Sequence, residues 1–107
     1  MRSLMVAVLV LVALPALADE AKIQVGAEAW AGFQEYKTAL SSTDAGFFAI
    51  SKDGGAWGWG KCRQGECETQ SVAKQAAIQR CEKYAGKGAC VIFARNAEIE
   101  VPYEAPH

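Results

Sequence analysis

The four cysteines are the residues of this chain with the widest choice of chemistry. Cys62, Cys67, Cys81 and Cys90 all lie in the second half of the sequence. Thiolates can bind zinc or exchange electrons, but the spacings here are C-x4-C and C-x8-C, and no C-x-x-C of a zinc knuckle or a thioredoxin-like pair occurs. An even number of cysteines in a small exported chain predicts two structural disulfides instead.

Four cysteines allow three connectivities. We favour Cys81–Cys90, because Cys81 is expected on the buried face of a helix and Cys90 begins the strand that returns along the sheet. Cys62 and Cys67 would then close the CRQGEC loop. Cys62–Cys90 with Cys67–Cys81 remains the alternative. In the chain-entropy model each short bridge contributes on the order of 2–3 kcal/mol.

The Trp57-Gly58-Trp59-Gly60 segment could bind a ligand. Exposed tryptophans separated by glycine can stack on sugar rings or bases, so Trp57 and Trp59 are a possible ligand platform. The competing and favoured interpretation is that both rings fill the core of a small domain. The alternating glycines predict close approach of another backbone on the opposite, smooth face, which could be a partner site.

Catalytic residues are scarce. His107 is the only histidine and the last residue, so a serine or cysteine nucleophile has no base. Asp44, Asp53 and Glu66 could form a hydrolase-like carboxylate pair, but a turn explains Asp53 and an exposed loop explains Glu66. We therefore predict a protein that is not an enzyme and has no cofactor-binding or metal-binding residues.

The first eighteen residues predict export. Arg2 gives a positive start, an apolar run follows from Leu4 to Leu14, and Ala16-Leu17-Ala18 is a small-x-small cleavage site. The apolar run is shorter than the roughly twenty residues that cross a bilayer. We expect residues 1–18 to be a signal peptide and the protein to be periplasmic or secreted.

The remaining 89 residues are enough for one small disulfide-stabilised domain, residues 19–107, with 19–26 as a flexible mature N-terminus. Without Arg2, ten basic residues face twelve acidic ones, a formal net charge of −2. This balance, with no basic cluster, argues against nucleic acid as a partner. No segment after Ala18 is apolar enough to span a membrane.

Two helices are expected. The spacing of apolar residues predicts an amphipathic helix from Ala27 to Leu40. A second helix is capped by Thr69 or Ser71 and runs to about Ala85. The inner face of the first helix carries Ala29, Phe33, Tyr36 and Leu40, and that of the second carries Ala73, Ala77, Cys81 and Tyr84.

A β-hairpin is expected around Asp53-Gly54, between FFAIS and AWGWGK. A two-residue type I′ turn pairs Ile50 with Trp57 and Phe48 with Trp59, which gathers four large side chains on one face. A three-residue loop would move the tryptophans to the other face. We favour the first register because it collects the apolar area.

A second hairpin pairs CVIFAR with EIEVPY through a turn at Asn96-Ala97. The expected pairs are Arg95–Glu98, Ala94–Ile99 and Ile92–Val101. The residues expected on one face are Cys90, Ile92, Ala94, Ile99 and Val101. The predicted fold is α+β: an antiparallel sheet of two β-hairpins with one central helix packed on it, plus the N-terminal amphipathic helix.

These motifs resemble a family of small exported bacterial domains of unknown function. The shared pattern is an F-A-[VI]-S-x-D-G hairpin, a cysteine loop, an alanine-rich helix ending in C-E and a C-x-[IL]-[FY]-A strand. The matching segments are 48–54, 62–67, 76–82 and 90–94. The resemblance implies a compact ββαββ unit with structural cysteines, and it implies no activity or ligand.

The sequence therefore predicts a non-enzymatic binding or accessory domain of the bacterial cell envelope, whose partner is an envelope protein or glycan. Two alternatives stay open. One is a glycan-binding or glycan-acting module that uses Trp57 and Trp59. The other is a small inhibitor of a hydrolase. The sequence specifies neither the ligand nor the oligomeric state.

Overall fold

The computed structural model describes residues 21–63 and 71–107. The predicted signal peptide, Glu66, Cys67 and Thr69 lie outside these residues. The elements, in chain order, are β1 (Ile23–Gln24), α2 (Ala27–Ala39), β2 (Asp44–Ser51), β3 (Trp57–Arg63), α3 (Ser71–Ala85), β4 (Cys90–Arg95), β5 (Glu98–Ile99) and β6 (Tyr103–Glu104).

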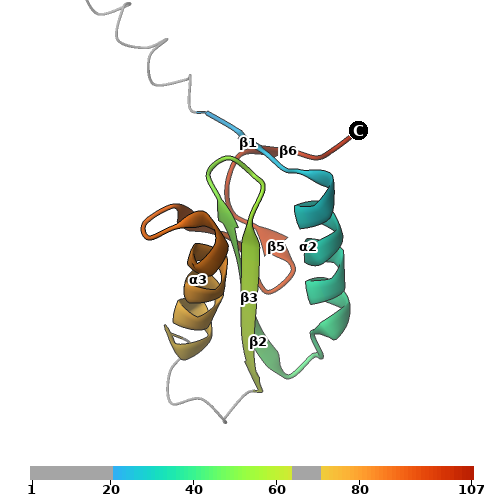
Figure 1. Ribbon diagram of the computed structural model, residues 1–107. Coiled ribbons are helices and arrows are strands. Elements are labelled where there is room, and N and C mark those ends of the chain that lie inside the picture. The colour runs from blue at the N-terminus through green and yellow to red at the C-terminus, as the bar shows by residue number, and fades with distance from the viewer. Residues whose placement is uncertain (1–20, 64–70) are drawn as a thin grey trace, which may run out of the picture.

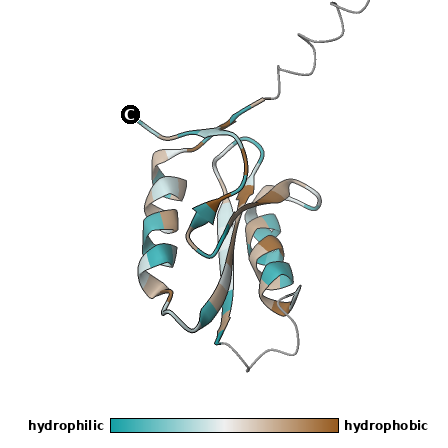
Figure 2. Ribbon diagram, turned by 180° about the vertical axis from the view of Figure 1, so that it is seen from behind, coloured by the Kyte–Doolittle hydropathy of each residue, from teal (hydrophilic) through white to brown (hydrophobic). Residues whose placement is uncertain are grey.

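The centre of the fold is a four-stranded antiparallel sheet with the order β3-β2-β4-β5. Helices α2 and α3 cover its opposite faces, so the domain has three layers (Figure 1). Hydrophobic and hydrophilic residues alternate along both helices (Figure 2). The predicted α+β class with an antiparallel sheet is confirmed.

The core under α2 is aromatic. Apolar side chains recur at helical spacing in α2, so Ala29, Phe33 and Tyr36 lie on one face of the helix and are buried against the sheet. The Phe33 ring packs edge-on against Phe48 and Phe93, with ring centroids 5.3 Å away in both cases. This side therefore holds most of the large apolar side chains.

The core under α3 is built from small residues, which lets helix and sheet approach closely. Ala73, Ala77 and Cys81 are buried along α3. A Cβ at Gly58 would lie only 2.5 Å from the Cys81 nitrogen, and one at Gly60 would lie 2.7 Å from the Ala73 oxygen. The predicted close approach on the smooth face is thus confirmed, but the approaching backbone is the chain's own helix and not a partner.

The hairpin of β2 and β3 has the predicted register, in which Ile50 pairs with Trp57 and Phe48 with Trp59. Its turn differs from the expected type I′. Gly54 has a φ of 81°, whereas Asp53 does not have the positive φ that type I′ needs at both central positions. The Gly54 amide instead donates to the backbone carbonyl oxygen of Ser51 at 2.8 Å, so the loop is longer than predicted.

The second hairpin is only partly as predicted. Ala94 pairs with Ile99 and Arg95 with Glu98, with Asn96 at a φ of 52° in the turn, a conformation that asparagine tolerates. The expected Ile92–Val101 pair is wrong. Strand β5 ends at Ile99, and the Glu100 amide donates to the Phe93 oxygen at 2.8 Å.

A β-bulge in β4 explains the rest of the difference. Phe48 pairs with Ala94 but the next residue, Ala49, pairs with Ile92, so Phe93 is the extra residue. The bulge reverses the alternation of side chains, and the predicted common face is therefore wrong. Cys90 and Ile92 contact the α3 core, while Ala94, Ile99 and Val101 contact the α2 core.

Residues near the two ends of the described chain form a short parallel sheet. Ile23 pairs with Tyr103 in β1 and β6, where the sequence predicts an unpatterned tail at 19–26. The Gly26 amide also donates to the Gly54 oxygen at 3.0 Å. The pairing partner lies eighty residues away along the chain, so no local pattern could reveal this strand.

The Cys81–Cys90 disulfide is confirmed, with Cα atoms 6.2 Å apart. It ties the end of α3 to the start of β4. The predicted Cys62–Cys67 bridge lies outside the described residues because Cys67 does. Neither described helix has the length and apolar character needed to span a membrane.

Candidate functional site

A surface pocket of about 400 Å³ lies where β3 begins. Its lining residues are Gly55, Ala56, Trp57 and Tyr84, and we call it the Trp57–Tyr84 pocket. Tyr84 comes from the last turn of α3 and is 76% exposed. The prediction that Tyr84 is part of the buried helix face is wrong: two of the residues that line the pocket with it, Gly55 and Ala56, offer no large side chain to cover the ring.

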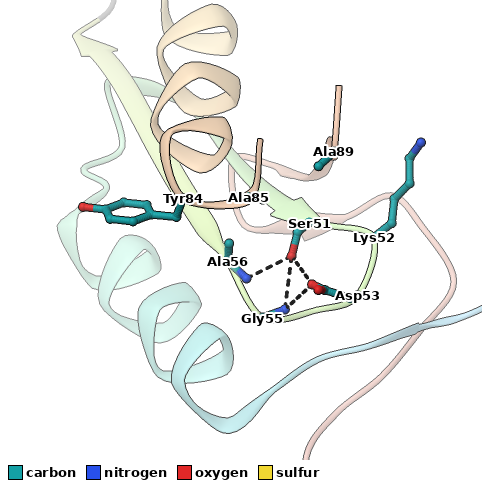
Figure 3. Close-up of a pocket in the computed structure, with 8 residues that line it drawn as sticks. All are labelled: Ser51, Lys52, Asp53, Gly55, Ala56, Tyr84, Ala85 and Ala89. Carbon is teal, nitrogen blue, oxygen red and sulfur yellow. Dashed lines mark hydrogen bonds between the residues drawn. The ribbon is translucent and has the colours of Figure 1, made fainter. Parts of the chain in front are cut away.

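A second pocket of about 450 Å³ adjoins the first and shares Gly55, Ala56 and Tyr84 with it. It extends under the β2–β3 loop towards Ala85 and Ala89, as Figure 3 shows. Lys52 and Asp53 bring charged groups to this end. The two pockets together form a surface that is aromatic at one end and charged at the other.

Ser51 fixes the loop between the two pockets. Its side chain is buried, and its hydroxyl donates to Asp53 Oδ1 at 2.5 Å. Ser51 Oγ also accepts hydrogen bonds from the amides of Gly55 at 3.1 Å and Ala56 at 2.9 Å (Figure 3). These bonds use the full capacity of a hydroxyl group. Ser51 is therefore a structural residue that shapes the loop.

Asp53 is held in its charged form. The Ser51 hydroxyl and the Gly55 amide donate to its carboxylate, and these hydrogen bonds lower the pKa of Asp53 below its usual range. At neutral pH the loop thus presents a fixed negative charge beside Lys52.

This pKa shift predicts a pH dependence of stability. A carboxyl group with a lowered pKa in the folded state stabilises the fold above its unfolded pKa, and the stabilisation is lost as the pH falls through its folded pKa. In an NMR titration we expect the pKa of the Asp53 carboxyl to lie below the range usual for an aspartate, and to be higher in Ser51→Ala, which lacks the largest cause of the shift. An unchanged Asp53 pKa in Ser51→Ala would contradict the hydrogen-bond assignment.

The structure does not bring the candidate catalytic carboxylates together. Asp44 begins β2, where its Oδ2 lies 3.3 Å from Lys61 Nζ, and Asp53 follows the other end of the same strand. An eight-residue strand separates the two ends by roughly 20 Å. Paired carboxylates of glycosidases lie within about 10 Å of one another, so these two cannot act as a pair. Glu66 lies outside the described residues.

Trp57 and Trp59 share a face, as predicted, and both are half-buried against the α2 core. The Trp57 indole covers Gly32 of α2 so closely that a Cβ at Gly32 would collide with it. The Trp59 ring lies 5.7 Å from the Tyr36 ring. Each ring thus has a packed side, and Trp57 also contributes to the pocket.

The remaining candidate residues can be placed only within the described part of the chain. Within residues 21–63 and 71–107, no three His, Cys, Asp or Glu side chains converge as metal ligands would. His107 is exposed at the end of the chain.

Three comparisons with known proteins bear on identity. No family model, curated protein or solved structure matches this chain.

Proposed function

We propose that this chain is an exported, non-enzymatic binding domain of the bacterial cell envelope, and that it holds its ligand in the Trp57–Tyr84 pocket. The observation that carries the proposal is the 76% exposure of Tyr84, the highest of the large apolar side chains in the described part of the chain. An exposed aromatic ring beside a pocket is typical of a binding site, because it gains buried area only when a ligand arrives.

The pocket suits a sugar ring. Trp57 and Tyr84 both line it, and the exposed Tyr84 ring offers a flat apolar surface on which the C–H face of a pyranose can stack. The hydroxyl groups of the sugar would find polar partners at the adjoining end, where Lys52 and Asp53 lie. A few polar groups beside an apolar wall are the usual composition of a small-ligand site. We therefore infer that the ligand is an envelope glycan, with Trp57 and Tyr84 in place of the Trp57 and Trp59 pair.

We also propose that the protein is located outside the cytoplasm. A signal peptide at 1–18 would bring the chain into an oxidising compartment, where disulfides such as Cys81–Cys90 persist. A Cys62–Cys67 bridge and membership of the family of small exported domains are proposed on the sequence motifs alone.

Replacing Tyr84 with alanine tests the site. We expect Tyr84→Ala to weaken binding of soluble peptidoglycan fragments at least tenfold, because the exposed aromatic ring beside the pocket is lost. The stability should change by less than about 0.5 kcal/mol, since the side chain is largely exposed. Titration of the mature protein with the fragments, followed by tryptophan fluorescence and by amide NMR shifts, measures the affinity.

Val72→Ala is the matched control. Val72 is 53% exposed on the same helix, near its other end, and its loss should leave binding unchanged. Equal affinity of Tyr84→Ala and the unmodified protein would contradict the proposed site. Blue-shifted emission that no peptidoglycan fragment alters would contradict glycan binding itself.

A further inference from the structure

The outer edge of β3 has no strand beside it within the described residues, since β3 ends the order β3-β2-β4-β5. The Ser51 amide donates to the Ala56 oxygen at 2.9 Å, which fixes the alternation of the β2–β3 ladder. Gly58 and Gly60 then bond to β2, while the backbone groups of Trp57, Trp59 and Lys61 point outward. In Figure 1, β3 runs between the two helices and neither crosses in front of it.

Arg80 of α3 occupies the middle of this edge. Its Nη1 donates to the Trp59 oxygen at 2.6 Å. Charged side chains placed on an edge strand are a common way to prevent uncontrolled pairing with other strands. The outward amide and carbonyl groups of Trp57 and Lys61, on either side of this contact, have no hydrogen-bond partner among residues 21–63 and 71–107. Arg80 thus blocks the edge at Trp59, while the outward backbone groups of Trp57 and Lys61 could each bond to an added strand.

The charge along this edge is positive. Lys61 lies on the strand itself, Arg80 reaches over it, and Lys83 is exposed one turn further along α3. Asp44 Oδ2 lies 3.3 Å from Lys61 Nζ and offsets that charge, while Glu82 keeps its own negative charge as it accepts the Gly88 amide at 2.9 Å. These five groups together carry a net charge of +1, with Arg80 at the middle of the edge. A second copy of the chain paired across a two-fold axis at Trp59 would bring Arg80 against Arg80, which disfavours self-association through this edge.

We propose that the outer edge of β3 docks an extended acidic segment of a partner protein, which adds to the sheet as a fifth strand. This is independent of the glycan pocket, since it uses backbone groups of Trp57, Trp59 and Lys61 and not the space under Tyr84. Strand addition draws its affinity from main-chain hydrogen bonds and its specificity from alternate side chains.

Arg80 makes the docking selective. An incoming strand must donate an amide to the Trp59 oxygen, so the guanidinium has to leave that oxygen. A carboxylate on the peptide offers Arg80 a stronger, charge-assisted hydrogen bond in exchange. A neutral or basic peptide offers none and leaves Arg80 without its acceptor. The half-exposed Trp57 and Trp59 rings flank the same edge and would contact the side chains on one face of the added strand.

A capped eight-residue peptide of alternating glutamate and valine is the probe. We expect it to bind the mature protein at low salt and to slow hydrogen exchange of the Trp57, Trp59 and Lys61 amides at least tenfold. Binding should weaken as salt is raised, because the attraction is between exposed charges. N-methylation of the peptide amides that face β3 should abolish binding, and N-methylation of the alternate amides should leave it unchanged.

Charge variants of the protein test the role of Arg80. Arg80→Gln and Arg80→Glu should lower the affinity for the acidic peptide at least tenfold, and Arg80→Glu should favour the matching lysine–valine peptide. Lys22→Glu is the control for Arg80→Glu, because it reverses the same charge at an exposed residue just before β1. It should have little effect on the affinity for the acidic peptide. Arg80→Gln keeps the aliphatic stem, so its fold can be verified by the unchanged amide spectrum.

Several results would overturn the inference. One is an acidic peptide that protects none of the three amides at millimolar concentration. Another is equal binding of the acidic and basic peptides. Protection that rises with protein concentration alone would assign the edge to a second copy. Shifts confined to Tyr84 and Trp57 on adding peptide would place the contact in the pocket. Equal glycan affinity of Tyr84→Ala and the unmodified protein, in contrast, would contradict the pocket and leave the edge unaffected, so the two proposals fail separately.

Discussion

Gly58→Ala is expected to destabilise the domain by about 3 kcal/mol, the upper end of what an overpacked site costs. The added Cβ would lie 2.5 Å from the Cys81 nitrogen and 2.6 Å from Arg80 Cβ. The first of these atoms belongs to the backbone of α3, and the Cys81–Cys90 disulfide ties that part of the helix to β4. Helix and strand must therefore separate to make room. In a domain of this size the loss corresponds to a fall in Tm of roughly 15–20 °C.

Gly55→Ala is the matched control for this prediction. Gly55 lies in the same hairpin. The atom nearest to a Cβ added there would be Asp53 Oδ1 at 3.5 Å, an ordinary van der Waals contact. We expect a change of less than about 0.5 kcal/mol. Urea denaturation of the three proteins gives the comparison. If Gly58→Ala were no less stable than Gly55→Ala, α3 would not pack on the glycine face of β3.

The glycine face also illustrates what the sequence could and could not specify. Alternation of glycine with tryptophan in β3 was enough to predict that another backbone approaches closely, because the requirement is local. The sequence could not show which backbone approaches. Only when α3 packs on the sheet does Cys81 come close to Gly58, and Ala73 to Gly60. The glycine face of β3, which the sequence suggests as a partner site, is therefore an interior surface that α3 covers.

The register of the β2–β3 hairpin was predictable for a similar local reason. Pairing Phe48 with Trp59 collects large side chains on one face, and a slip by one residue would divide them. The bulge at Phe93 was not predictable, because it depends on how β4 matches β2, a strand more than forty residues earlier. The β1–β6 pairing was missed because it joins distant segments with no pattern of their own.

The candidate site shows the same division. Trp57 was found from its residue type and its glycine neighbours. Tyr84 was missed because its spacing from Ala77 and Cys81 is that of a buried helix face. In the fold, the ring lies beside a pocket whose other lining residues include Gly55 and Ala56, which offer no large side chain to cover it. An aromatic residue in the last turn before Gly86 was the one available sequence signal for it.

Loss of the Cys81–Cys90 disulfide is the second large effect we expect. Cys81→Ala with Cys90→Ala should cost about 2–3 kcal/mol, the chain entropy that a loop of this length returns to the unfolded state. Cys81 is fully buried, so a small packing loss adds to this. Each single variant should cost at least as much, because it also leaves a free thiol. Urea denaturation of the double and single variants makes the comparison.

The linkage itself can be identified by tryptic digestion without reduction. Cleavage at lysine and arginine places each cysteine on its own peptide, at 62–63, 64–74, 81–83 and 88–95. We expect 81–83 to be joined to 88–95, and on the sequence prediction 62–63 to be joined to 64–74. A peptide that joins Cys62 to Cys90 would contradict both bridges at once. In the alternative pairing, Cys62–Cys90 with Cys67–Cys81, the double variant would break two separate bridges, and its stability loss would exceed that of either single variant.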